Sequence, residues 1–394
     1  MDHMKLIGTL QDIKDEGRTV CYILHHPVFK ETSSTTKVRV AFDGSAKTST
    51  DSSLNDSLLT GPVIQDDLLD LMIRFRNHTV ALVADVAKMY RQVRIHPDDT
   101  PLQRILWRSS QISPNQIFEL QTITYGLSSS SFIETRVLKQ LASDVGGKYE
   151  HAGTVVSNDF YMDDFLSGAD TVEEAKRLRN DVQSLMAEGE FELRKWSSNS
   201  SEVLSGLSPD ALEGQSTLYF EAEQKVKTLG VAWETGTDCL RVDIPTLREE
   251  EHWTKRRIFS TIAQLYDPLG LVSPVVAWAK IQMQHLWLVS VDWDDKIPYE
   301  ICGNWKDFYE QLPLLQSFKV PRCVLVRQSS NSHFHVFCDA RSINGEGEHI
   351  VQLITSKSRV ALWKTGQINH ISFHPTKMFS SDEKRFWYYK YGPN

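Results

Sequence analysis

The chain has few cysteines, and their spacing argues against two common uses of cysteine. Its 394 residues include five cysteines, which are widely scattered and form no Cys-x-x-Cys pair. Reduced thiols are therefore expected, rather than a zinc site or a disulfide framework. The sequence also has no apolar run long enough to cross a membrane, and its first residues lack a signal-peptide pattern. These absences predict an intracellular protein, in the cytoplasm or the nucleus, without a membrane partner.

The chain also lacks the excess of positive charge that is usual in nucleic-acid-binding proteins. It has 43 Lys and Arg residues against 51 Asp and Glu residues, a formal net charge of -8. A basic groove can coexist with an acidic exterior, so this balance weakens the expectation of a nucleic-acid partner without removing it. The hydrophobic share of 41% and the charged share of 24% are those of a globular protein. The length predicts two or three domains.

Two adjacent aspartates lie in the most informative stretch of the sequence. Asp163 and Asp164 stand between the apolar runs Thr154–Val156 and Phe165–Leu166. This pattern predicts two short strands joined by a tight turn, with the carboxylates at its tip. The carboxylates repel each other, and a bound divalent cation would remove that cost because hard cations take oxygen ligands. The alternative is a solvated acidic turn.

A third carboxylate stands at the end of a predicted buried strand. Val80–Ala84 is a short, continuous apolar run, typical of a strand covered on both faces, and Asp85 follows it directly. If this strand lies beside the aspartate turn, Asp85, Asp163 and Asp164 converge. Three such carboxylates can hold two metal ions about 3.5–4 Å apart, the arrangement that polymerases and nucleases use for displacement at phosphorus.

Two amphipathic helices are predicted around these strands. From Asp66 to Arg76 the apolar residues recur at helical spacing. The segment Thr171–Glu174 has the form of a capping box, an apolar helical face follows it, and Gly189 suits the end of that helix. We expect both helices to pack on the sheet.

The segment Tyr161–Asp164, preceded by the strand-borne Asp85, resembles the palm of reverse transcriptases. A narrower resemblance relates the chain to the polyproteins of BEL/Pao long-terminal-repeat retrotransposons of animals. It covers about residues 20–360, and its motifs are specific in combination. They are Val38–Thr48, Ser53–Asp56, Gly61–Pro62, Gln65–Leu68, Lys88–Gln92, Gln103–Trp107, Phe191–Trp196 and Ile258–Pro274.

The resemblance implies an α+β fold with three parts. Residues 1–235 would form the fingers and palm of a reverse transcriptase. Residues 236–320 would form a mostly helical thumb or connection region. Residues 321–394 would hold a truncated ribonuclease H-like remnant and a divergent tail.

The ribonuclease H-like part is expected to be damaged. His333–Ala340 resembles the first strand of that fold, and Leu353–Ala361 resembles a later strand. Too few residues stand between them for the intervening strand, so neither Glu346 nor Glu348 would lie on a strand beside Asp339. Cleavage of the RNA strand of an RNA–DNA hybrid is therefore not expected.

The resemblance implies RNA-directed DNA polymerisation as the function. The partners would be an RNA or DNA template–primer and deoxynucleoside triphosphates. The cofactor would be Mg²⁺ or Mn²⁺, held by Asp85, Asp163 and Asp164 as the catalytic residues. The alternative is a catalytically inactive retroelement remnant that at most binds nucleic acid. Two departures from the family pattern favour it, Ala87 in place of an acidic residue and Ser131 in place of a proline.

The resemblance also assigns nucleotide-binding residues. Arg39 would contact the incoming triphosphate, and Tyr90, five residues after Asp85, would lie against its sugar and exclude a 2′-hydroxyl. Gly126 lies in a loop that can approach a nucleotide closely, because it has no side chain. Lys195 lies near the position where related polymerases hold a basic residue that assists pyrophosphate departure. Plainer alternatives are a solvated strand face for Arg39, a core position for Tyr90 and a solvated side chain for Lys195. A further alternative for the function is a metal-dependent nuclease that uses the same carboxylates. It is disfavoured because Tyr90 and the glycine loop would then have no role.

Overall fold

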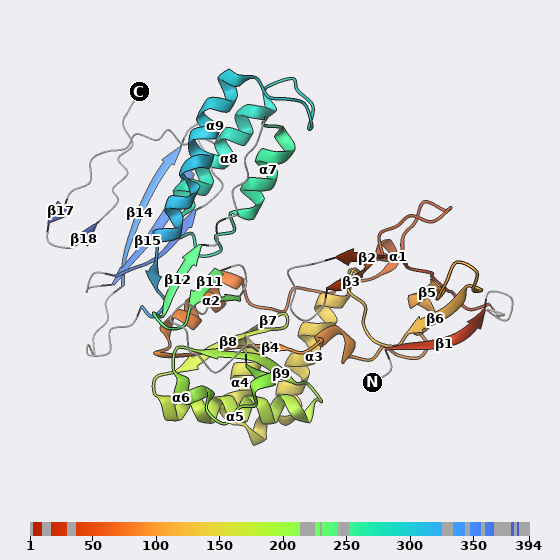
Figure 1. Ribbon diagram of the computed structural model, residues 1–394. Helices are drawn as coiled ribbons and strands as arrows, with labels where there is room; N and C mark the ends of the chain where they lie inside the picture. The colour runs from red at the N-terminus through yellow and green to blue at the C-terminus, as the bar shows by residue number, and fades with distance from the viewer. Residues whose placement is uncertain are drawn as a thin grey trace. The chain divides into compact units, whose positions relative to one another are not determined.

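The computed structural model describes residues 3–9, 17–29, 37–212, 225–228, 231–242, 244, 252–324, 334–342, 347–355, 359–365, 380–381 and 384–385. Helices and strands occur together in it, which confirms the expected α+β class (Figure 1). The chain forms two compact units. The first comprises residues 1–67, 82–197 and 201–215, and the second comprises residues 68–81, 198–200 and 216–394. None of the described helices is long and apolar enough to cross a membrane.

The first unit is built around a sheet with the strand order β7-β8-β4-β9. The strands are β4 (Val80–Val86), β7 (Phe160–Tyr161), β8 (Asp164–Ala169) and β9 (Leu193–Ser198). β4 lies between β8 and β9, and six of its seven residues are buried, as the continuous apolar run Val80–Ala84 predicts. Three helices pack together beside the sheet, and the last two also contact it (Figure 1). They are α3 (Ser130–Val145), α4 (Glu150–Asn158) and α5 (Val172–Glu188).

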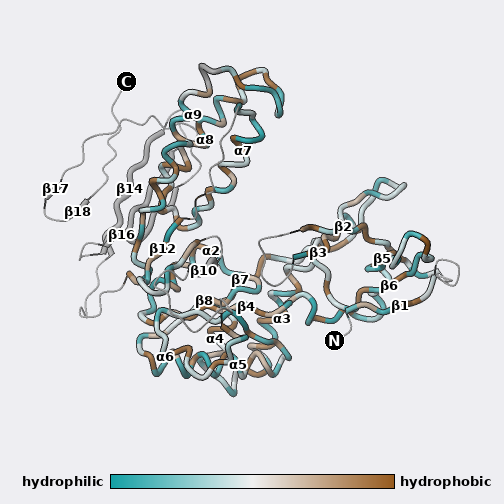
Figure 2. Tube along the Cα trace, viewed as in Figure 1, coloured by the Kyte–Doolittle hydropathy of each residue, from teal (hydrophilic) through white to brown (hydrophobic). Residues whose placement is uncertain are grey.

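Aromatic and aliphatic side chains fill the space between this sheet and its helices. The ring of Phe165 lies 5.1 Å from that of Phe160 and 5.8 Å from that of Trp196, measured between centroids. Hydrophobic residues gather along α4, β4 and β8 (Figure 2). Removal of this apolar surface from water is the main force that holds the elements together. α5 adds one face of buried side chains: Ala175, Leu178, Val182, Leu185 and Met186.

Both predicted helices are present. α2 (Leu68–Asn77) falls within one or two residues of the predicted range. At the start of α5, Thr171 Oγ1 accepts a hydrogen bond from the amide of Glu174 at 3.2 Å, and Glu174 Oε2 accepts one from the amide of Thr171 at 3.1 Å. The capping box is therefore confirmed, and Gly189 follows the last residue of α5.

The predicted strand at Thr154–Val156 is wrong. These residues belong to α4, and the strand that enters the aspartate turn, β7, is much shorter. Val155 and Val156 are both buried. A short apolar run can be the buried face of a helix as readily as a strand, and periodicity over so few residues does not separate the two.

The first unit also contains two smaller sheets and several short helices. One sheet has the order β1-β6-β5 and the other pairs β2 with β3. The expected strand that carries Arg39 is present as β3. The strands are β1 (Met4–Thr9), β2 (Leu24–Phe29), β3 (Val38–Asp43), β5 (Arg104–Trp107) and β6 (Gln116–Leu120). The short helices are α1 (Leu54–Ser57), η1 (Met89–Arg91), η2 (Thr100–Gln103), η3 (Gly146–Lys148), α6 (Ser201–Leu204) and η4 (Pro209–Ala211).

The second unit combines α2, a small sheet and a helical cluster. The sheet has the order β10-β11-β12-β13, with β10 (Lys225–Thr228), β11 (Val231–Glu234), β12 (Cys239–Val242) and β13 (Val320–Pro321). The cluster contains α7 (Lys255–Gln264), α8 (Ser273–Trp287), α9 (Tyr299–Gln311) and η5 (Leu312–Ser317). Trp253 packs edge-on against Tyr309, with 4.7 Å between ring centroids. This tryptophan therefore belongs to the core of the cluster.

A fully buried arginine links two segments of the second unit by hydrogen bonds. The guanidinium of Arg322 donates to both carboxyl oxygens of Asp238, at 2.6 and 2.8 Å. It also donates to the carbonyl oxygens of Phe75, His78 and Thr79, at 2.7, 2.8 and 3.2 Å. The last carbonyls of a helix have no partner within the helix. One side chain thus supplies hydrogen bonds at the C-terminal end of α2.

Three antiparallel strands follow in the order β14-β15-β16. They are β14 (Phe334–Ser342), β15 (Gly347–Thr355) and β16 (Arg359–Thr365). β14 pairs with β15 along its whole length, and Asp339 stands opposite Ile350. Glu348 stands opposite Arg341, two residues along β14 from Asp339.

The expected shortage of a strand in the ribonuclease H-like part is wrong. β15 is the intervening strand, and Leu353–Ala361 contains the end of β15 and the start of β16. Four residues separate β14 from β15 in the sequence, and connections of two to five residues commonly join antiparallel neighbours. The absence of hybrid cleavage can therefore no longer be argued from a missing strand. Glu346 and most of the divergent tail lie outside the described residues.

Candidate functional site

The aspartate turn lies against the end of β4. Met162 and Asp163 form the turn between β7 and β8. The amide of Val86 donates to the carbonyl oxygen of Asp163 at 2.9 Å. Asp85, the residue before Val86, is thereby held beside Asp163. The structure brings these two carboxylates, from positions 78 residues apart in the sequence, to one place.

The carboxyl of Asp163 lies in surroundings that disfavour its ionised form. Burial raises its pKa, and the negative charge of Asp85 raises it further. Lys195 of β9 donates to Asp85 Oδ2 and supplies a positive charge beside this pair. The side chain of Asp85 is 23% exposed, so solvent and solutes can reach it. Such a pair of carboxylates gains from a nearby cation.

Lys195 occupies a rare backbone conformation within β9. Its φ is +54°, in the left-handed region that costs a residue with a side chain roughly 1–2 kcal/mol. Its side chain is 52% exposed and ion-paired with Asp85 at the same time. Neither alternative considered for this lysine included that ion pair, because nothing in the sequence places β9 beside the end of β4.

Asp164 is the first residue of β8 and is partly buried. Within the part of the chain that the structure describes, no three or more His, Cys, Asp and Glu side chains form a group that could hold a metal ion. The structure brings Asp85 and Asp163 together, and Asp164 is the next residue in the chain. Their oxygens are the ligands that Mg²⁺ and Mn²⁺ prefer, so this donor set fits a hard divalent ion.

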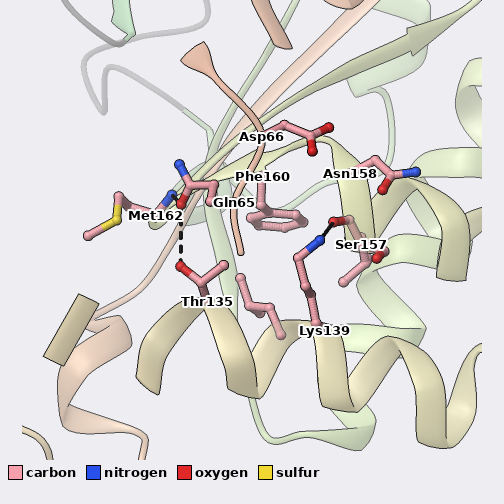
Figure 3. Close-up of a pocket in the computed structure, with 10 residues that line it drawn as sticks. Gln65, Asp66, Thr135, Lys139, Ser157, Asn158, Phe160 and Met162 are labelled. Carbon is pink, nitrogen blue, oxygen red and sulfur yellow. Dashed lines mark hydrogen bonds between the residues drawn. The ribbon is translucent and has the colours of Figure 1, made fainter. Parts of the chain in front are cut away.

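Gln65 contacts the aspartate turn through its side chain. Its Oε1 accepts hydrogen bonds from the amide of Met162 at 3.1 Å and from Thr135 Oγ1 at 3.3 Å (Figure 3). These three residues line a small pocket that α3 and α4 also border. Elsewhere in the pocket, Lys139 Nζ donates to the carbonyl of Ser157 at 3.0 Å and joins α3 to α4. The sequence motif that contains Gln65 gave no indication of this contact.

Tyr90 lies in η1 and is partly buried. Its ring stands edge-on to that of Tyr125, with 6.2 Å between centroids. Burial raises the pKa of its hydroxyl, and the charge of Glu134 raises it further. The hydroxyl of Ser131, the residue that replaces a proline of the family pattern, lies within hydrogen-bonding range of Tyr90. Neighbouring side chains therefore fix the ring of Tyr90. This agrees both with a residue that excludes a 2′-hydroxyl and with a core position.

Glu134 of α3 is a fully buried acidic residue whose importance the sequence analysis missed. Neither of its carboxyl oxygens makes a well-aligned hydrogen bond with a described residue, although the hydroxyl of Tyr90 lies close by. Burial raises the pKa of Glu134 to about 7, and the charge of Asp163 contributes to the increase. Its position four residues before the buried Leu138 was the available signal, because positions i and i+4 share one helix face.

Arg39 and Gly126 belong to neighbouring parts of the first unit. Arg39 is exposed on β3, opposite Val28 of β2. Gly126 has a φ of +91°, and a Cβ on it would lie 2.2 Å from the carbonyl oxygen of Phe42. Glycine is therefore required at position 126 by the close approach of β3. The close approach expected at Gly126 was that of a nucleotide, whereas the structure shows that of β3.

Comparison with protein families gives a match in the second unit. Residues 254–371 match the family model described as the Pao retrotransposon-like RNaseH-like domain. The matched range contains the helices α7, α8 and α9 and the strands β14, β15 and β16. It does not contain the aspartate turn or β4. No curated protein matches the chain. The match supports a relation of the chain to the proteins of Pao-type retrotransposons.

Proposed function

We propose that the chain is an RNA-directed DNA polymerase of a Pao-type retrotransposon. The observation that carries this proposal is the hydrogen bond between the end of β4 and the aspartate turn, which places Asp85 beside Asp163. Residues 1–235 would supply fingers and palm. Residues 236–320, most of which lie within the range that matches the RNaseH-like family model, would supply a thumb or connection region. The remaining residues would supply a ribonuclease H-like part. The family match over residues 254–371 supports the retrotransposon origin and leaves the polymerase activity to be tested.

The reaction would add a deoxynucleotide to a primer. The 3′-oxygen of the primer bonds to the α-phosphorus of a deoxynucleoside triphosphate, its proton leaves, and the bond from that phosphorus to pyrophosphate breaks. When bound, Mg²⁺ or Mn²⁺ would polarise the attacking oxygen and neutralise the leaving pyrophosphate. Asp85, Asp163 and Asp164 would supply the oxygen ligands. The nucleic-acid partner would be an RNA or DNA template with its primer.

Other residues of the first unit would receive the nucleotide. Lys195 forms an ion pair with Asp85. When a nucleotide binds, the ammonium group of Lys195 would pair with a phosphate oxygen in place of that carboxylate. Tyr90, fixed by its contact with Tyr125, would lie against the sugar and exclude a 2′-hydroxyl. Arg39 would contact the triphosphate from β3. The loop at Gly126 would keep β3 close to this part of the unit.

The second candidate is a catalytically inactive remnant that binds nucleic acid. Ala87 and Ser131 depart from the family pattern, and Glu134 adds a buried carboxyl without a well-aligned partner. A carboxyl of this kind costs stability, and an accumulated substitution would explain it better than a site under functional constraint.

Primer extension by the purified chain tests the first proposal. With Mg²⁺ or Mn²⁺, the wild-type chain should extend a DNA primer on an RNA template. Asp163→Asn should reduce the rate by roughly 10³-fold, the size of loss expected when one electrostatic contact with the transition state is removed. Folding should not suffer, because asparagine removes the repulsion between positions 85 and 163.

An exposed aspartate of α5 provides the matched control. Asp181→Asn changes the same functional group on the solvent side of the helix and should leave extension unchanged. Fluorescence anisotropy of labelled template–primer should show equal binding by all three proteins. A wild-type chain that binds template–primer without extending it would reject the polymerase and favour the remnant.

A further inference from the structure

The aspartate turn has an unfavourable backbone conformation at its first residue. Met162 has a φ of +55°, whereas Asp163 is not among the residues with positive φ. A two-residue hairpin turn with positive φ at its first position normally has glycine there, because other residues are strained. Something outside the turn must therefore hold Met162 in this conformation.

The side chain of Gln65 is placed to do this. Its Oε1 accepts from the amide of Met162 at 3.1 Å. Thr135 Oγ1 lies 3.3 Å from the same oxygen, but its single proton can also be donated to the carbonyl of Ser131, which is 3.0 Å away. The amide of Met162 is consequently the stronger of the two donors to Gln65 Oε1. A backbone amide without a partner would be costly at this partly buried position.

We propose that Gln65 is a positioning residue that fixes the aspartate turn and, through it, the orientation of Asp163 toward Asp85. The consequence for catalysis rests on the polymerase function proposed above. Gln65 does not touch the reacting atoms in this arrangement. It sets the conformation of the residue that precedes Asp163, and a carboxylate shifted by a fraction of an ångström binds a cation less well.

Three substitutions separate the acceptor oxygen from the bulk of the side chain. Gln65→Met keeps the length of the side chain and removes the acceptor. Gln65→Glu keeps an acceptor at the same position and should rescue most of the loss. Thr135→Val removes only the weaker donor and should behave as wild type. If Gln65→Met does not fold, Gln65→Asn, whose amide is one methylene too short to reach, takes its place.

The first readout needs no catalytic activity. Exchange of the Met162 amide hydrogen, followed by nuclear magnetic resonance, should be at least tenfold faster in Gln65→Met than in wild type or Gln65→Glu. Binding of Mn²⁺, followed by electron paramagnetic resonance of the free ion, should weaken about tenfold in the same variant. Equal exchange rates and equal Mn²⁺ affinity in a folded Gln65→Met protein would overturn the proposal.

The second readout uses primer extension and distinguishes positioning from general stability. Gln65→Met should lower kcat about tenfold and raise the Mg²⁺ concentration needed for half-maximal rate, with the KM for nucleotide and the affinity for template–primer unchanged. If the loss of kcat across the variants is explained by their lower melting temperatures alone, the proposal is contradicted. If wild type does not extend primers, the polymerase proposal fails, and the amide exchange and Mn²⁺ results still decide the role of Gln65.

Discussion

The buried carboxyl of Glu134 should make the stability of the first unit fall as pH rises. Burial raises its pKa from an ordinary value of 4.5 to about 7 in the folded chain. Below pH 4.5 both the folded and the unfolded chain carry the proton, so ionisation of the group does not affect stability. Between pH 4.5 and 7 the unfolded chain loses the proton first, which favours unfolding. Above pH 7 the full cost is present.

The size of the effect follows from the two pKa values. A separation of one pKa unit corresponds to about 1.4 kcal/mol, so the cost approaches roughly 3 kcal/mol at high pH. Between pH 5 and pH 8 the wild type should lose about 2–3 kcal/mol on this account. Glu134→Gln has nearly the same shape and no titrating proton. The free energy of unfolding of Glu134→Gln, relative to that of the wild type, should therefore rise by this amount from pH 5 to pH 8. The cost of burying the amide of the variant does not depend on pH and does not affect this change.

Hydrogen exchange of peptides from α3 and β4 reports the stability of the first unit separately from the second. Rates should be measured for wild type and Glu134→Gln at pH 5, 6, 7 and 8, each corrected for the intrinsic rate at that pH. Glu173→Gln, an exposed residue of α5, is the matched control and should show no pH-dependent difference. The reasoning fails if the free-energy difference between Glu134→Gln and wild type stays constant from pH 5 to pH 8.

Two further predictions concern single side chains. Tyr90→Ala should admit ribonucleotides in primer extension while keeping some incorporation of deoxynucleotides; unchanged sugar discrimination in an active variant would assign Tyr90 to the core. Arg322→Lys should destabilise the second unit by about 3–5 kcal/mol, because a lysine cannot serve both the carboxylate of Asp238 and three carbonyl oxygens. Thermal unfolding measures this loss, and Arg256→Lys, at an exposed ion pair with Asp294, should change stability by less than about 1 kcal/mol. Equal losses in both variants would refute the prediction for Arg322.

The sequence predicts those features that depend on a few neighbouring residues. The capping box of α5 needs only Thr171 and Glu174, and both of its hydrogen bonds are present. Val80–Ala84 is apolar without interruption, and all five of its residues are buried in β4. The same kind of argument wrongly predicts a strand at Thr154–Val156, because a short apolar run fits the buried side of α4 equally well.

Other features depend on how distant segments meet, and these escaped the sequence analysis. The ion pair of Lys195 with Asp85 arises because β9 is a neighbour of β4 in the sheet. Gln65 reaches Met162 across 97 positions of sequence. Glu134 was recognisable as an acidic residue near an apolar helix face, but only the packed structure shows that its carboxyl lacks a well-aligned partner. The three-strand arrangement of β14, β15 and β16 was missed because Leu353–Ala361 was taken as one strand, whereas it contains the end of β15 and the start of β16.

The buried Arg322 also constrains the order in which the chain can be completed during synthesis. Its carbonyl partner at Phe75 lies 247 positions earlier in the sequence. Ribosomes add about 5–20 residues per second, so roughly 12–50 s separate the two. During that interval the end of α2 must use water, or a chaperone, in place of the guanidinium. A nascent chain released before residue 322 would keep α2 without this anchor, and cellular proteases would meet it in that state.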